Sequence, residues 1–118
     1  MAIIFAIPIQ TYGESITLAS GQKVELEDVV KTYLRDGKNW VLVFNYVTDV
    51  PIDDEESTKR QAALLFDYTI EGIEKAKATA TAFRAFNGPK AIIGVTFRKS
   101  YTTVFEKNDG KWEMYDPN

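Results

Sequence analysis

The fold is decided by the stretch Trp40-Val41-Leu42-Val43-Phe44-Asn45-Tyr46-Val47-Thr48. Most of its side chains are β-branched or aromatic, and the polar residues Lys38-Asn39 and Asp49 mark its two ends. A run of this kind is typical of a strand whose two faces are both covered. We therefore predict that residues 40–48 form the central strand of a sheet, buried on most of both faces.

A long helix is predicted after this strand. Beyond Pro51 the chain carries four acidic residues at positions 53–56, and mainly apolar residues then recur at helical spacing. They are Ala62, Leu65, Phe66, Thr69, Ile70, Ile73 and Ala76. The pattern predicts a helix over about residues 53–76, weakened at Gly72.

Upstream, the sequence predicts a hairpin and a short helix. Two short alternating runs, Ser15–Leu18 and Lys23–Leu26, flank a loop whose Gly21 suits a positive φ. The spacing then changes to that of one apolar helix face, with Gly37 placed as a C-terminal cap. The residues of this face are Leu26, Val29, Val30, Tyr33 and Leu34. We therefore predict a helix over about residues 26–36.

The chain begins with the apolar stretch Ala2–Ile9. No basic residue precedes it, and it is well short of the roughly 20 residues that a membrane span needs. We expect a buried strand; the alternatives are an exposed strand that pairs with a second copy of the chain, or the remnant of a longer signal. The expected location is the cytoplasm, or the periplasm if the stretch is a signal remnant, and no membrane partner is expected.

Strand-like alternation returns in the second half. Residues 78–86 alternate, residues 91–105 are rich in β-branched and aromatic side chains, and Asn108-Asp109-Gly110 supplies a tight turn before Lys111–Tyr115. Over residues 76–85 alanine would equally let the helix continue, so helix and strand both stay open there. Together the patterns predict one α+β domain over residues 1–118, with an antiparallel or mixed sheet of about five to six strands packed against the long and the short helix.

The chain contains no histidine and no cysteine. Within this chain alone, that excludes Ser-His-Asp and Cys-His catalysis, thiol redox chemistry and Cys/His zinc sites. Carboxylate, lysine and tyrosine chemistry remains, but no spacing singles out a catalytic pair. The net charge of −3 argues against a general binder of nucleic acid. We therefore expect no catalytic residue, no metal and no cofactor.

Three groups of residues are candidates for a site. The acidic run Asp49–Glu56 lacks the pattern of a calcium loop and is better explained as the capped start of the long helix. Residues 75–105 carry basic residues interleaved with aromatic ones and no acid. The candidate binding surface in this segment is Arg84, Lys90, Arg98, Lys99 and Tyr101. The candidate lining of an apolar pocket between helix and sheet is Phe44, Tyr46, Phe66 and Tyr68.

The layout of the chain also resembles a group of small uncharacterised bacterial proteins. The resemblance is carried by Ser20–Leu26, by the strand ending Tyr46-Val47-Thr48-Asp49, by Ser100–Phe105 and by Asp109-Gly110-Lys111-Trp112. It covers most of residues 15–115. What it implies is a bacterial α+β domain, with no catalytic residue to carry over.

The function we expect is non-catalytic binding, with a protein partner or a second copy of the chain as ligand. The acidic first half and the basic second half support this, because two surfaces of opposite charge create electrostatic fields that set the association rate and the choice of protein partner. The alternative is a small-molecule-binding or weakly enzymatic domain with a pocket between helix and sheet. A third is binding of single-stranded nucleic acid by residues 75–105, through stacking and phosphate attraction.

Overall fold

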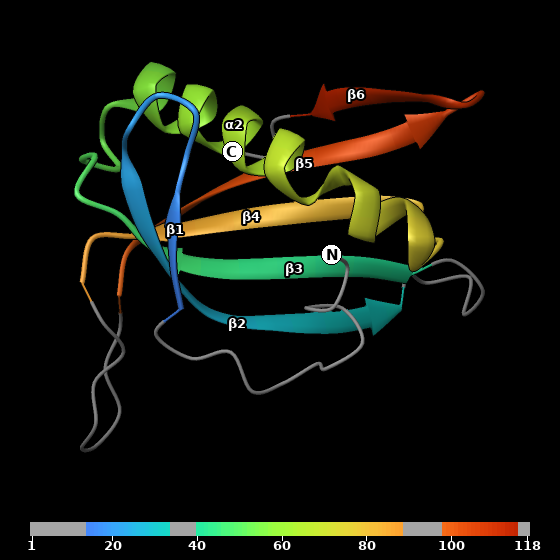
Figure 1. Cartoon of the computed structure of the whole chain (residues 1–118), viewed down its shortest axis with the longest axis horizontal. Coiled ribbons are helices and arrows are strands. Elements are labelled where there is room, and N and C mark those ends of the chain that lie inside the picture. Colours follow the sequence, from blue (N-terminus) through green and yellow to red (C-terminus); the bar gives the residue numbers. More distant parts are fainter. Residues whose placement is uncertain (1–13, 34–39, 89–97, 116–118) are drawn as a thin grey trace.

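A computed structural model of the chain describes residues 14–33, 40–88 and 98–115. They form one six-stranded sheet and one helix, an α+β arrangement (Figure 1). The strands are β1 (Glu14–Thr17), β2 (Lys23–Tyr33), β3 (Trp40–Val47), β4 (Ala80–Phe86), β5 (Ser100–Asn108) and β6 (Lys111–Tyr115), and the helix is α2 (Glu55–Lys75). The predicted class is confirmed with one helix. The apolar start Ala2–Ile9 lies outside the described residues.

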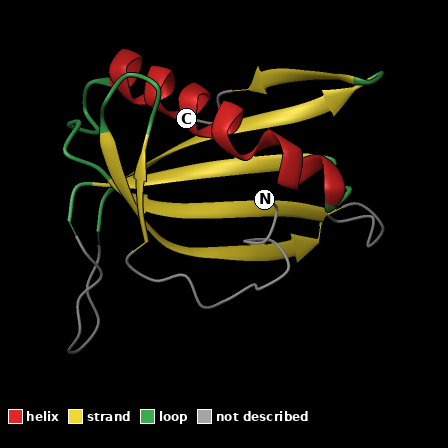
Figure 2. Cartoon of the chain, viewed as in Figure 1, coloured by secondary structure: helices red, strands yellow, loops and turns green. Residues whose placement is uncertain are grey.

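The sheet is mixed, and its strands lie side by side in chain order, from β1 to β6. Every neighbouring pair is antiparallel except β3 and β4, which run parallel. A parallel pair needs a crossover connection, and α2 supplies it. The helix crosses one side of the sheet, and β1 curls over that same side (Figure 2). The central strand predicted at residues 40–48 is confirmed as β3.

The start of α2 has local causes in the acidic run. Asp54 is the N-cap, and its carboxylate accepts a hydrogen bond of 3.2 Å from the backbone N–H of Ser57. Hydrogen bonding by the Ser57 side chain and, second, by its backbone N–H lowers the pKa of the Asp54 carboxyl. Glu55 and Glu56 follow in the first turn, where the helix dipole favours negative charge. Among the described residues no three acidic side chains gather as a metal site.

The helix ends at Lys75, before residues 76–85, for which the sequence left helix and strand both open. Lys77 adopts a φ of 61°, which breaks the helical path, and Thr79 donates to the carbonyl of Trp40 before β4 begins. Residues 80–86 are therefore strand. The C-terminal hairpin is confirmed as β5 and β6, with a φ of 53° at Asp109 and 80° at Gly110.

The short helix predicted over about residues 26–36 is wrong where the structure describes that range, because residues 26–33 belong to β2. The cause is a β-bulge. Leu26 pairs with Tyr46 and Asp28 pairs with Asn45, so Glu27 is one residue too many. The extra residue shifts the alternation, so that Leu26 and Val29 lie three apart yet face the same side. This spacing imitates a helix; residues 34–37, with the predicted cap, lie outside the described residues.

The core lies between α2 and the sheet and is dominated by aromatic rings. Phe83 of β4 is fully buried and stacks on Phe44 of β3 at a centroid distance of 5.0 Å. Phe66 of α2 meets Phe83 edge-on and stacks on Phe105 of β5 at 4.3 Å. Trp112 of β6 closes the cluster with an edge contact to Phe66. Helix and sheet are thus joined by one continuous aromatic contact.

Removing the ring at the centre of this cluster should be costly. Phe83→Ala leaves a cavity among three rings, so we expect the free energy of unfolding to fall by about 3–5 kcal/mol. Tyr68→Ala, at a helix position that is 57% exposed, should change it by less than about 0.5 kcal/mol. Urea unfolding followed by circular dichroism measures both. Equal losses in the two variants would contradict this description of the core.

Candidate binding face

The side of the sheet away from α2 is the candidate site, and we call it the open face. Strand alternation puts the core residues Phe44, Phe83 and Phe105 on the helix side. Their neighbours along each strand therefore point the other way. Among the described residues, α2 and the curled strand β1 lie on the helix side (Figure 2), and no further helix or strand covers the open face.

An apolar band crosses the middle of the open face. It is a single row of directly paired residues that runs over five strands from β2 to β6. The row is Val30, Val43, Ala82, Val104 and Tyr115. Val30 and Tyr115, at its two ends, are 45% and 54% exposed, Val43 and Val104 are half-buried, and Ala82 at its centre is buried, at 7% exposed. Monomeric proteins seldom expose large contiguous apolar patches unless something binds there.

Two rows with polar groups flank the apolar band, one on each side. The first, which we call the Arg84 row, is Asp28, Asn45, Arg84 and Thr102. The second, which we call the Glu106 row, is Thr32, Val41, Ala80, Glu106 and Glu113. In the Arg84 row, Asn45 donates a 2.6 Å hydrogen bond to the carboxylate of Asp28. The side chains of Arg84 and Glu106 are exposed and form no hydrogen bond or ion pair with any described residue.

Near the bulge, the open face is closed off by Arg98. Its guanidinium pairs with both carboxylate oxygens of Glu27, at 3.0 and 3.2 Å, and donates a 2.8 Å bond to the carbonyl of Gly88. It also lies over the ring of Phe86, 3.7 Å from the centroid. The Arg98 and Glu27 side chains are only 17% and 16% exposed. Arg98 therefore holds this end of the sheet together and is not available to a ligand.

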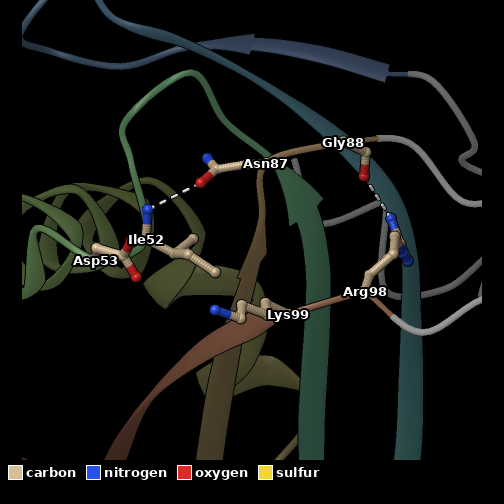
Figure 3. Close-up of a pocket in the computed structure, with 6 residues that line it drawn as sticks. All are labelled: Ile52, Asp53, Asn87, Gly88, Arg98 and Lys99. Carbon is tan, nitrogen blue, oxygen red and sulfur yellow. Dashed lines mark hydrogen bonds between the residues drawn. The ribbon is translucent and has the colours of Figure 1, made fainter.

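A hollow of about 280 Å³ lies beside Arg98 (Figure 3). Asn87 forms one wall: its side chain accepts from the backbone N–H of Ile52 and donates to the carbonyls of Thr48 and Val50. These bonds fix the connection from β3 to α2. Lys99 and Asp53 border the hollow and are both exposed. The hollow is open to solvent, and the polar side chains of Asn87 and Arg98 that border it form hydrogen bonds with backbone atoms.

The predicted binding surface does not come together on one face. Arg84 lies on the open face, whereas Tyr101 is buried on the helix side of β5. Arg98 is engaged with Glu27, and Lys99 borders the hollow. Lys90 lies outside the described residues. Phe83, which would have to stack a base in the nucleic-acid hypothesis, is in the core.

The four predicted pocket residues do not line a common pocket. Phe44 and Tyr46 are buried beneath α2, and Phe66 stacks on Phe105. Tyr68 lies on the outer side of the helix, so it does not share a lining with the other three. The space between helix and sheet at these positions is occupied by packed rings.

One buried ionisable group stands out in this core. The hydroxyl of Tyr46 finds no hydrogen-bond partner among the described residues, and the residue is fully buried. Burial raises the pKa of this phenol far above its ordinary value. A second shifted group, Glu74, is on the surface; hydrogen bonds from Lys107 at 2.8 Å and Trp112 at 2.6 Å lower its pKa. Each shift has a structural cause.

The sequence identified two candidates on the open face, Arg84 and Arg98, and missed the apolar band and Glu106. A signal was present: residues 40–48 are nearly continuous in β-branched and aromatic side chains, which predicts cover on both faces of β3, and the described helix covers one. Locating the band required the strand registers, which a single sequence does not contain.

Comparison of the chain with protein-family models, with curated proteins and with solved structures gives no match. The resemblance to small bacterial proteins therefore stays a prediction. No helix in the described part of the chain has the length and apolar character needed to cross a membrane.

Replacing the buried phenol tests its lack of a partner. Tyr46→Phe removes an unsatisfied hydroxyl and keeps the ring, so we expect the free energy of unfolding to rise by about 1 kcal/mol near neutral pH. Because the folded pKa is raised, the stability of the parent should decline once the pH exceeds about 10, where the unfolded phenol ionises. The advantage of Tyr46→Phe should therefore grow in alkali. Urea titrations of both proteins at neutral and alkaline pH measure this, and a destabilised variant would contradict it.

The connection fixed by Asn87 can be tested separately. Asn87→Ala leaves two carbonyls and one N–H of the β3–α2 connection without their partner, and we expect a loss of about 1–3 kcal/mol of stability. Hydrogen exchange should show faster exchange of the Ile52 amide, which donates to Asn87. Asn108→Ala, at an exposed site whose side chain contacts Glu113 alone among the described residues, is the control. Unchanged exchange at Ile52 would argue against this role of Asn87.

Proposed function

We propose that this chain is a non-catalytic binding domain that holds a protein surface against its open face. The observation that carries the proposal is the apolar band, an unbroken row across five strands with no described helix or strand over it. A sheet that is apolar on both sides gains stability when both sides are covered. A protein surface is the cover that fits a row of apolar residues spread over five strands, whereas small molecules favour concave sites.

The ionisable groups support a non-catalytic role. Active sites usually collect groups with perturbed pKa values in a cleft. Here the resolved shifts fall on Asp54, a helix cap, on Glu74, a surface hydrogen-bond acceptor, and on Tyr46, a residue sealed in the core. These three lie apart in the fold, and each is explained by its own neighbours.

The charge of the open face also favours protein over nucleic acid. Asp28, Glu106 and Glu113 lie on it together with Arg84. Such a mixture does not attract phosphate, whose neutralisation supplies most of the affinity of nucleic-acid binders. Mixed charges around an apolar centre are the usual composition of a protein interface.

Photo-cross-linking tests the proposal in the cells that naturally produce the chain. A photoreactive amino acid at position 104, inside the apolar band, should give a covalent adduct with a protein. The same amino acid at Glu71, on the exposed side of α2, should give none. Adding Val30→Asp, which puts a charge into the band, should abolish the adduct from position 104. If position 104 gives no adduct, or if Glu71 gives the same one, the open face is not the binding site.

A further inference from the structure

We infer that the protein held against the open face is a second copy of the chain, related by a twofold axis that runs along the apolar band. This inference rests on the proposed function and names the partner. In a face-to-face pair of sheets the inner surfaces lie about 10 Å apart and their side chains interdigitate. The apolar band is a row of directly paired residues across the strands, so a twofold axis along it brings the band of one copy onto the band of the other.

The charges are arranged to suit this symmetry. Rotation about an axis along the apolar band exchanges its two sides, so that the Arg84 row of one copy lies over the Glu106 row of the other. Because Arg84 pairs with Asn45 and Thr102, and Ala80 pairs with Glu106, the registers set the contact. Arg84 comes over the partner's Ala80, beside the partner's Glu106. Two side chains extending from sheets about 10 Å apart can meet there.

The contact occurs twice, because a twofold interface uses the same patch on both copies. Each Arg84 meets a Glu106, and each Glu106 meets an Arg84. Within one copy these two residues do not pair: Arg84 lies directly opposite Thr102, four residues from Glu106 along β5. The absence of a described partner for either side chain thus fits a pair that forms between copies.

Self-complementarity favours a copy over a different protein. Arg84 lies on one side of the apolar band and Glu106 on the other, so the twofold axis brings each beside the other, while Asp28 comes over the partner's Thr32. Like charges facing one another across an interface would oppose association. When the open faces of two copies meet in this orientation, Arg84 of one copy lies beside the carboxylate of the partner's Glu106.

Charge reversal tests the pairing. In sedimentation velocity over a concentration series, the parent should dimerise. Arg84→Glu and Glu106→Arg each create two like-charge contacts, and each should raise the dimer dissociation constant about tenfold or more. An equimolar mixture of the two variants restores both opposite-charge contacts in a heterodimer, so it should dimerise at least as well as the parent. Glu71→Arg, which makes the same charge change on α2, should have no effect. Circular dichroism confirms that each exposed-site variant is folded.

Two outcomes would overturn the inference: a parent that is monomeric throughout the series, or a mixture that associates no better than its components. The cross-linking experiment distinguishes this failure from failure of the proposed function. An adduct at position 104 with a different protein would leave the binding domain in place and exclude the twofold pair. No adduct at all would remove both.

Discussion

The parallel pairing of β3 and β4 is the constraint on which the rest of this fold depends. Two parallel neighbours cannot be joined by a tight turn, so the chain must cross the sheet, and it does so as α2. A helix is about 10 Å wide and strands are about 4.8 Å apart, so one helix shields roughly two strands directly. The sheet has six. A single crossover therefore covers the helix side only with help, and it leaves the other side without a described helix.

The strands at both ends of the sheet provide the additional cover on the helix side. At one end, β1 curls over and contributes Ile16 to the core. At the other, β6 supplies Trp112, whose ring packs on Phe66 and whose indole N–H donates to Glu74 of the helix. Both outer hairpins thus complete the cover that α2 begins. Both hairpins contribute residues to the open face, but among the described residues neither of them folds over it.

The sequence predicted the elements whose causes are local. The β-branched run at residues 40–48, the acidic cap before α2 and the turn at Asp109-Gly110 each fix their own structure within a few residues. The prediction over residues 26–36 was wrong because its cause is not local: the bulge at Glu27 is defined by the register against β3. The open face was missed for the same reason. Val30, Val43, Ala82 and Val104 are distant in sequence, and only the pairing of four strands makes them one row.

The bulge also explains why two arginines of this sheet have different roles. The extra residue turns Glu27 toward the open face beyond the Arg84 row, where it meets Arg98 in a bidentate pair over Phe86. A planar guanidinium held by two carboxylate oxygens, one carbonyl and a ring keeps little capacity for anything else. Arg84 lies in the middle of β4, opposite Asn45, whose amide is already engaged with Asp28. The strand registers therefore give Arg98 a partner among the described residues. In the proposed twofold pair, the charge of Arg84 is met by Glu106 of the second copy.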